Sequence, residues 1–409
     1  MKLKRRLLSV SSLWVMVVCL LAAPAMASSR LIPLKEKVGD PFTVFHLGRS
    51  VKDPRQAFFV PYRGNPVVRG PNLYAANPVK AGGVWNVYFG GWRAAGQQND
   101  EIYLSRTRDD TLTHGFSGIR TIIGHGVYDH VNDPSAVRLQ DGNWVMAMTT
   151  RPVGDVDKCS TLLSPDGVHW PQLTDRRHEV TIRGARVTMC GRPSLIFNSH
   201  YKDRHHRWRW EMYFDGSVNN SPWSQHLAVS YEAFPRHFTY VRLIGLMGDA
   251  DIKLVNGQYI AAYRRIGPGM DSWWRLRYAT SRDGLHFAEH GQLVAPDPLA
   301  SYDDCGVTNP GWAINEKGLI TAVMYGGMAT CPWGTSKQQL GVALPQAEVT
   351  LFTGNLAHWH RQAISATAQR IDTHQYNNVD RIMIIPQPGA RPIINQPVHG
   401  TRRDAWAVK

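Results

Sequence analysis

The stretches Asp133-Pro134-Ser135-Ala136-Val137 and Asp141-Gly142-Asn143-Trp144-Val145-Met146 contain the pattern that decides the fold. A short polar residue and a proline precede an apolar strand, and a tight turn then leads into a second strand that contains an aromatic residue. Asp-Gly favours the positive φ angles of a two-residue hairpin. The two strands are therefore predicted to be antiparallel neighbours.

The same pattern recurs along the chain, with further starts at Asn77, Arg192, Asp249 and Asn309. With Asp133 included, successive starts are 56, 59, 57 and 60 residues apart, and such an even period is typical of a repeat architecture. Each unit continues with a third strand that ends in a turn, clearest at 162–170 and 278–287, and a fourth strand follows. Four short antiparallel strands in each of five units predict an all-β, five-bladed β-propeller.

The two ends of the chain lie outside this repeat. Residues 1–27 contain a basic start, an apolar stretch and the small-x-small sequence Ala25-Met26-Ala27, which together predict a signal peptide. Residues 28–353 are assigned to the propeller, and 354–409 to a C-terminal extension that packs on it. We therefore expect a secreted or periplasmic protein. No later segment is apolar enough over ~18 residues to predict a membrane span.

Four cysteines remain after signal cleavage, an even number that favours disulfides in an exported protein. The expected pairs are Cys159 with Cys190, which would join adjacent blades, and Cys305 with Cys331, which flank the first two strands of one blade. The sequence has no CxxC pair and no histidine-rich metal spacing. No metal site or cofactor is predicted, although a structural ion such as calcium at the centre stays open.

The formal charge of the chain is +14, and the first 27 residues contribute four of these charges, which leaves +10 on the mature protein. A basic excess suits an anionic glycan or envelope surface, or it is an ordinary solubility feature, because the basic residues are dispersed. Nucleic acid is not predicted as a partner, since no recognition motif accompanies the charge.

The first strand of each blade lines the central axis of a propeller, so the starts of these strands are expected at one mouth. This predicted ring consists of Asn77, Asp133, Arg192, Asp249 and Asn309. The ends of the second strands return to the same mouth and would add Trp92, Arg151, Asp215, Arg264 and Gly326.

Repeats that open with Asp-Pro and contain a Ser-x-Asp-Gly-x-His-aromatic element, as at 164–170 and 281–287, resemble the five-bladed β-propeller glycoside hydrolases. The similar groups are the arabinanases and β-xylosidases, and the invertases and levansucrases. The resemblance covers roughly 72–353. It implies three catalytic acids on the innermost strands, which places Asp133, Asp249 and Asp304 in these roles. At least two carboxyls are needed, because the leaving oxygen is protonated while the opposite face of the sugar is attacked.

The sequence departs from this family pattern at two points. The first blade has Asn77 where these families usually have a catalytic Asp, and Asp304 is shorter than the usual Glu. Shifted roles and lost activity both fit these departures. Asp133 also has a purely structural alternative, since an Asx residue before proline often organises a turn.

Residues expected to contact substrate are Asn77, Trp92, His130, Arg192, Asp215 and Asn309. Arg192 suits either the clamping of an anionic sugar or an ion pair with Asp133 or Asp249. We therefore predict a glycoside hydrolase that cleaves a polysaccharide or oligosaccharide through acidic residues in the central funnel. The alternative is a catalytically inactive propeller that binds glycans.

Overall fold

The computed structural model describes residues 41–47, 50–94, 96–97, 99–202, 205, 208–245, 247–266, 275–296, 302–329 and 337–352. The predicted signal peptide and the extension at 354–409 lie outside the described residues. The chain divides into two units, 1–49 with 346–409, and 50–345. In the first unit, β1 (Pro41–Leu47) pairs antiparallel with the 346–352 end of β21 (Gln338–Phe352).

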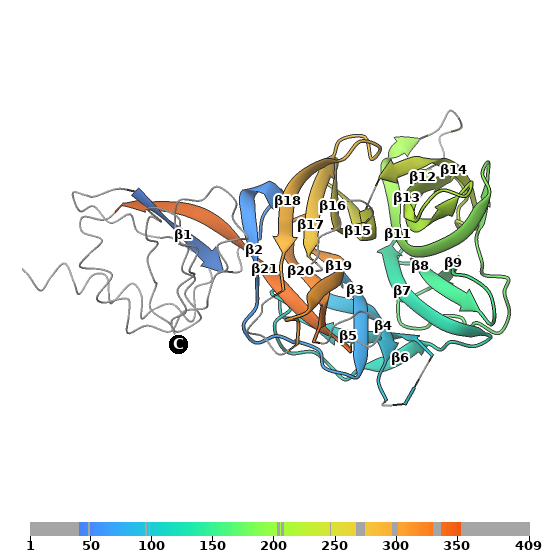
Figure 1. Cartoon of the computed structure of the whole chain (residues 1–409), viewed down its shortest axis with the longest axis horizontal. Helices are drawn as coiled ribbons and strands as arrows, with labels where there is room; N and C mark the ends of the chain where they lie inside the picture. The colour runs from blue at the N-terminus through green and yellow to red at the C-terminus, as the bar shows by residue number, and fades with distance from the viewer. Residues whose placement is uncertain are drawn as a thin grey trace, which may run out of the picture. The chain divides into compact units, whose positions relative to one another are not determined.

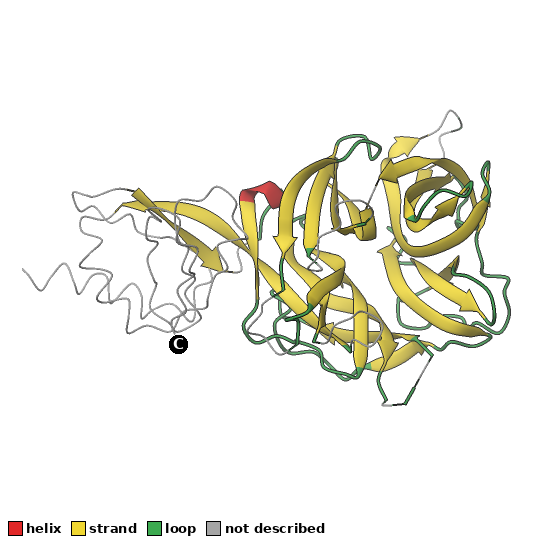
Figure 2. Cartoon of the chain, in the orientation of Figure 1, coloured by secondary structure: helices red, strands yellow, loops and turns green. Residues whose placement is uncertain are grey.

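The second unit contains five antiparallel meanders, one for each predicted repeat (Figures 1 and 2). The first meander consists of β3 (Asn72–Ala81), β4 (Val84–Trp92), β5 (Glu101–Thr107) and β6 (Arg120–Ile123). The second consists of β7 (Tyr128–Arg138), β8 (Trp144–Pro152) and β9 (Lys158–Ser164). The third consists of β11 (Val187–Lys202), β12 (Trp208–Val218), β13 (Ser224–Ser230) and β14 (His237–Gly245), with β10 (Thr181–Arg183) parallel to β14.

The fourth meander consists of β15 (Met247–Val255), β16 (Gln258–Arg265), β17 (Leu276–Ser281) and β18 (Ala288–Val294). The fifth consists of β19 (Gly306–Ile314), β20 (Ile320–Met328) and β21, and β2 (Ala57–Pro61) pairs with β21 as an additional strand. Within the described residues the one helical element is the short 3₁₀ turn η1 (Pro54–Gln56). The all-β prediction is confirmed.

Two meanders differ from the predicted four-strand unit. The second has three named strands, and its outer edge is a single bridge between Ser160 and Glu179. The fifth takes β2 from the segment that precedes the repeats. The repeat pattern did not predict the reduced edge of the second meander. A strand added from outside the repeat, from residues 31–72 or from the tail after Thr353, is in contrast what the sequence predicts, and β2 comes from the first of these segments.

The first strands of the meanders contact one another in the order β3, β7, β11, β15 and β19, and β19 also contacts β3. The β19–β3 contact includes a parallel bridge between Ile314 and Val79, which joins the first and fifth meanders in one sheet. The starts of these strands are thereby brought close together.

Every first strand has a β-bulge at the same place, where two residues lose their partners on the second strand. The first residue of each bulge has a left-handed backbone with φ between 47° and 56°, at Ala75, Asp133, Arg192, Asp249 and Asn309. The predicted alignment is therefore shifted by two residues in the first meander. Asn77-Pro78 imitates the Asp-Pro step, but the residue equivalent to Asp133 is Ala75.

In four of the five meanders, the residue two positions after the start of the bulge links its meander to the next; we call these four the latch residues. Each accepts a hydrogen bond of 2.7–2.9 Å from a backbone N–H of the following first strand. The pairs are Asn77 with Ala136, Ser135 with Leu195, Ser194 with Ile252, and Asp251 with Trp312. Asn77, predicted to bind substrate, is thus a latch residue that is 2% exposed.

The equivalent position in the fifth meander is Gly311, which has no side chain to offer. A Cβ built at Gly311 would lie 1.8 Å from the carbonyl oxygen of Ala76, so β19 approaches β3 backbone to backbone. Glycine is therefore required by close packing at this junction.

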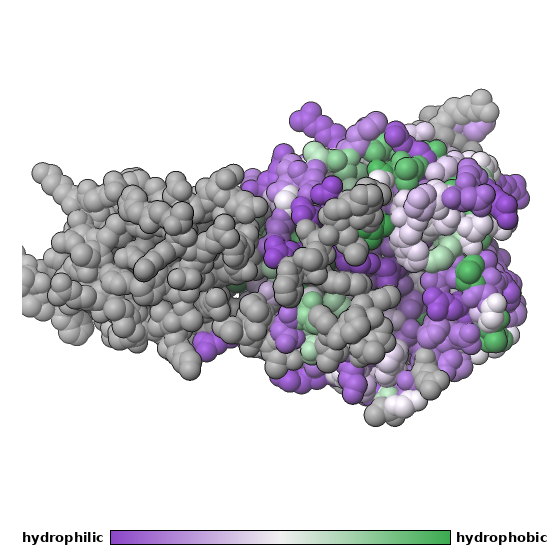
Figure 3. Space-filling model, in the orientation of Figure 1, coloured by the Kyte–Doolittle hydropathy of each residue, from purple (hydrophilic) through white to green (hydrophobic). Residues whose placement is uncertain are grey.

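Apolar side chains fill the space between neighbouring meanders. The Asp-Gly turns of the predicted Ser-x-Asp-Gly element also dock there, because the hydroxyls of Tyr88 and Tyr213 donate to the carbonyl oxygens of Gly167 and Gly284. Hydrophilic residues cover much of the described face in Figure 3, with small apolar patches between them. Aromatic residues on the second strands, such as Tyr88 and Tyr213, thus fix the turn of a neighbouring meander.

The predicted disulfide between Cys159 and Cys190 is present and joins β9 to β11 with a Cα–Cα distance of 5.3 Å. Of the second predicted pair, Cys331 lies outside the described residues, so the link from Cys305 to Cys331 stays a prediction. None of the helical structure in the described part of the chain is long and apolar enough to cross a bilayer.

Candidate functional site

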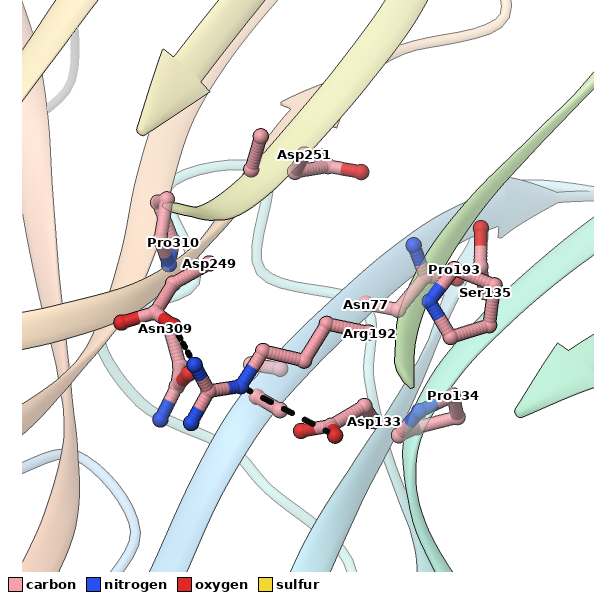
Figure 4. Close-up of a pocket in the computed structure, with 13 residues that line it drawn as sticks. Asn77, Asp133, Pro134, Ser135, Arg192, Pro193, Asp249, Asp251, Asn309 and Pro310 are labelled. Carbon is pink, nitrogen blue, oxygen red and sulfur yellow. Dashed lines mark hydrogen bonds and ion pairs between the residues drawn. The ribbon is translucent and has the colours of Figure 1, made fainter. Parts of the chain in front are cut away.

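A pocket with an empty volume of about 330 Å³ lies where the five first strands meet (Figure 4). All five strands contribute to its wall, and each bulge supplies both of its residues. The lining residues are Ala75, Ala76, Asn77, Asp133, Pro134, Ser135, Arg192, Pro193, Asp249, Ala250, Asp251, Asn309 and Pro310. The five predicted ring residues are all among them.

Arg192 lies at the centre of the polar groups in this pocket. Its Nη1 pairs with Oδ1 of Asp249 and lies 3.8 Å from Oδ2 of Asp215, while its Nε lies 4.0 Å from Oδ2 of Asp133. The backbone N–H of Arg192 donates to Oγ1 of Thr149 over 2.7 Å, which supports the left-handed bulge. One guanidinium thus connects three carboxyls, as the dashed lines in Figure 4 show for two of them.

Asp249 has both carboxyl oxygens occupied. Oδ1 pairs with Arg192, and Oδ2 accepts from Nε of Arg264 over 2.9 Å and from the hydroxyl of Thr308 over 2.7 Å. Its side chain is 1% exposed. Two guanidinium groups and a hydroxyl therefore hold the Asp249 carboxyl in one orientation at the pocket.

Asp133 is in a different environment. Its Oδ2 accepts from the hydroxyl of Thr149 over 2.9 Å, while its buried Oδ1 has no hydrogen-bond partner among the described residues. Burial raises the pKa of Asp133 to about 6, although the Arg192 charge and the Thr149 hydrogen bond oppose the shift. Asp133 can therefore hold or release a proton near neutral pH.

Asp215 lies behind this pair and is not among the residues that line the pocket. It is fully buried, and its Oδ2 accepts from the backbone N–H of Asp249 over 2.8 Å. Burial raises the pKa of Asp215 to about 7, opposed by Arg192 and Arg264. Its contacts support the bulge at Asp249.

Other predicted site residues lie outside the pocket lining. Asp304 is exposed in the turn that precedes β19, and Trp92 is half-buried at the end of β4, opposite Asn72. Asn309 does line the pocket and its amide donates to Gln338 over 3.4 Å. The structure therefore brings Asp133 and Asp249 together and leaves Asp304 apart from them.

A second polar cluster, missed by the sequence reasoning apart from His130, lies between the first two meanders. The carboxylate Oδ2 of Asp100 lies 2.9 Å from Nδ1 of His130 and accepts from the amide of Asn132 over 3.2 Å. The same amide also donates to the hydroxyl of Tyr74 over 2.9 Å. Burial, together with the charges of Asp100 and Asp133, raises the pKa of Tyr74 well above its usual value. Asp100 precedes a third strand without a motif, so no sequence signal marked it.

No group of three metal-ligating side chains suited to a metal ion occurs within the part of the chain that the structure describes. The open question of a central structural ion is not tested by this observation. The titratable groups described above are paired with arginine, threonine, asparagine or histidine side chains instead.

No protein-family model matches the chain, and no curated protein matches it by sequence. Solved structures do match it. The structure of a BT0996 RGII complex superposes with a TM-score of 0.53 at 11% identity, covering 74% of this chain and 93% of the other. At this level of identity the superposition shows a shared fold.

Two further structures agree with this assignment of the fold. The catalytic domain of a GH62 α-L-arabinofuranosidase from Coprinopsis cinerea gives a TM-score of 0.50 at 12% identity, covering 72% of this chain and 98% of its own. A GH62 hydrolase in complex with xylotriose gives 0.50 at 11% identity, covering 70% and 96%. At such low identity the likeness establishes the fold, and the function has to be argued from the pocket.

Proposed function

We propose that the five meanders close into a five-bladed β-propeller. The protein is then an exported glycoside hydrolase, and its central pocket cleaves glycosidic bonds in a polysaccharide or oligosaccharide. The ring order of the first strands and the β19–β3 contact support the closure. The predicted signal peptide and the Cys159–Cys190 disulfide favour export, because disulfides persist in oxidising compartments.

The observation on which the hydrolase proposal rests is the carboxyl of Asp133. It is buried beside the pocket, one of its oxygens is unpartnered within the described structure, and its pKa is raised to about 6. A neighbouring carboxyl, Asp249, pairs with two guanidinium groups. A pocket carboxyl with a raised pKa beside a charged partner is a candidate for proton transfer, which glycosidic bond hydrolysis requires.

The residues around Asp133 have distinct parts in this proposal. Asp133 takes a proton from the attacking water, and the nearby Arg192 stabilises the ionised form that does so. Asp249 holds Arg192 in place through its own ion pair and so acts as a positioning residue. Arg192 is also the group best suited to contact an anionic sugar, since a guanidinium binds carboxylates in a planar geometry.

A glycan-binding propeller without hydrolytic activity is the second candidate, and one observation favours it. The bulge position of the first meander is Ala75, where the resembled families would place an acidic residue. Both oxygens of Asp249 are occupied, so of the two predicted catalytic carboxyls in the pocket lining Asp133 alone has an unpartnered oxygen within the described structure.

The two candidate functions are separated by screening the purified protein against a glycan panel for both reducing-sugar release and binding.

Asp133→Asn should lower kcat by about 10²-fold or more, as expected for loss of a general base, while the affinity for the glycan is largely kept. Asparagine tolerates the left-handed backbone, so folding should be preserved. Asp175→Asn, at an exposed carboxyl outside the pocket lining, is the matched control and should keep its turnover.

Wild-type turnover in Asp133→Asn would contradict the assigned role of Asp133. Binding of several glycans by the wild type without cleavage of any would favour the binding module instead.

A further inference from the structure

The first meander presents no titratable group at its bulge. Ala75 occupies the position that Asp133 and Asp249 have in their own strands, and its methyl group lines the pocket. Hydrolysis of a glycosidic bond requires one group that removes a proton from water and another that protonates the leaving oxygen. With Asp249 fixed by Arg192 and Arg264, a second proton-transfer group has to come from outside the bulge positions.

The Asp100–His130 cluster lies at the same end of the first strands as the pocket. Tyr74 directly precedes Ala75, and Asn132 directly precedes Asp133, and these two neighbours are hydrogen-bonded to each other. The charge of Asp100 contributes to the raised pKa of Asp133. The cluster is therefore electrostatically connected to Asp133 and lies beside the gap at Ala75.

The partner of His130 defines its orientation. A carboxylate only accepts hydrogen bonds, so Nδ1 of His130 has the proton in its contact with Asp100 and Nε2 is left for another partner. Asp100 is 4% exposed, whereas the side chain of His130 is 29% exposed. A buried carboxylate thus fixes the orientation of a partly exposed imidazole ring.

The other charged groups around His130 are accounted for by their own contacts. Arg151 lies opposite His130 in the β7–β8 register and pairs with Asp157 over 2.7 Å. Asp133 follows three residues later on the same strand. Asp100 is thus the carboxylate bonded directly to the imidazole, and it is also bonded to Asn132, which keeps it in place.

We propose that His130, oriented by Asp100, is the second proton-transfer group of the pocket, an inference that rests on the proposed hydrolase function. Asp133 removes a proton from a water molecule, whose oxygen forms a bond to the anomeric carbon. The bond from that carbon to the leaving oxygen breaks, and its electron pair stays on the oxygen. Nε2 of the His130 imidazolium donates its proton to this oxygen. Asp133 then loses a proton to solvent and His130 regains one, which restores both groups.

Two other Asp–His pairs supply an internal comparison. His169 lies 2.6 Å from Asp166, and His286 lies 2.7 Å from Asp283, in both cases through Nδ1. Both pairs are in the exposed turns that follow third strands, with histidine side chains 80% and 69% exposed. Because their carboxylates are also open to solvent, these pairs stabilise turns, and His169 is a suitable control for His130.

The test uses the full mature protein and a glycan that the panel identifies as a substrate. His130→Ala should lower kcat by about 10²-fold or more with a smaller change in KM, and added imidazole should restore part of the lost kcat. His130→Gln keeps a donor toward Asp100 but transfers no proton, so it should be as slow as His130→Ala. Asp100→Asn should lower kcat less, because the imidazole itself is still present and loses only its carboxylate partner. His169→Ala should match the wild type.

The outcomes separate this inference from the function on which it rests. If the wild type cleaves the glycan and Asp133→Asn does not, while His130→Ala keeps wild-type kcat, the role of His130 is rejected and the hydrolase stands. The same rejection follows if His130→Gln stays fully active, or if imidazole restores nothing to His130→Ala. If the wild type cleaves no glycan, the hydrolase proposal fails and the role of His130 fails with it.

Discussion

Asp215 shows how burial and ion pairing compete at a single residue. It is completely buried, it supports the backbone of Asp249, and Arg192 and Arg264 lie close enough to favour its charge. Burial is the larger effect and raises the pKa of Asp215 to about 7. The native protein therefore binds a proton at Asp215 that the unfolded chain, with a carboxyl pKa of about 4, releases.

This difference predicts a pH dependence of stability that Asp215→Asn should remove. A group with a raised native pKa stabilises the fold fully below about pH 4 and loses that contribution as the pH rises to about 7. The free energy of unfolding of the wild type should thus fall relative to Asp215→Asn across this range, by on the order of a few kcal/mol. Urea unfolding at several pH values measures the difference.

The exposed carboxyl Asp175 supplies the control, and Asp175→Asn should change the free energy of unfolding by less than about 0.5 kcal/mol. The opposite result would be a free energy of unfolding that rises with pH in the wild type relative to Asp215→Asn. It would show that the ion pairs affect Asp215 more strongly than burial does.

Each first strand has a bulge whose two residues line the pocket, and in four of the five strands a latch residue fixes the neighbouring strand. Ser194 is the clearest latch, because its hydroxyl accepts from the backbone N–H of Ile252 and donates to the carbonyl of the same residue, both over 2.8 Å. The element that positions the pocket is therefore built from paired backbone contacts between meanders.

Ser194→Ala should lower the free energy of unfolding by about 1–3 kcal/mol, because it leaves a buried N–H and a buried carbonyl of Ile252 without the hydroxyl. Thr174 is exposed, and Thr174→Ala should change stability by less than about 0.5 kcal/mol. Denaturant unfolding of both variants measures the effect. If Ser194→Ala is as stable as the wild type, water replaces the hydrogen bonds of the Ser194 hydroxyl.

The sequence was sufficient to predict the meanders, because hairpin turns and aromatic second strands recur at a nearly constant period. The alignment of the repeat was wrong in the first meander, at the bulge that begins with Ala75. Ala75-Ala76 contains neither the polar residue nor the proline of the other units, whereas Asn77-Pro78 contains both, so the alignment moved to the latch position. A bulge is a backbone feature, and alanine can occupy it without leaving a sequence signal.

At the scale of the whole molecule, the site combines residues whose proximity no spacing rule encodes. Asp133 and Asp249 were predicted together because both occupy the repeat position. Asp304 followed from the resemblance alone and lies in an exposed turn. The contact of Asp100 with His130 joins two meanders, so it depends on how neighbouring units pack and could not be found from either unit alone.

The junction between β19 and β3 brings the last repeat against the first, and Gly311 is the residue on which this contact depends. A Cβ at Gly311 would lie 1.8 Å from the carbonyl oxygen of Ala76, where both partners are backbone and neither can move without disturbing its strand. Gly311→Ala should therefore lower the free energy of unfolding by at least the ~1–3 kcal/mol typical of overpacking, and it should lower the melting temperature of the whole unit 50–345.

Gly118 has open space around it, so Gly118→Ala is the matched control and should melt like the wild type. Calorimetry should give a single transition for all three proteins if the ring is closed, because every meander then depends on its two neighbours. A Gly311→Ala protein that melts with the wild type, or that loses only a separate minor transition, would mean that the first and last meanders do not hold the ring together.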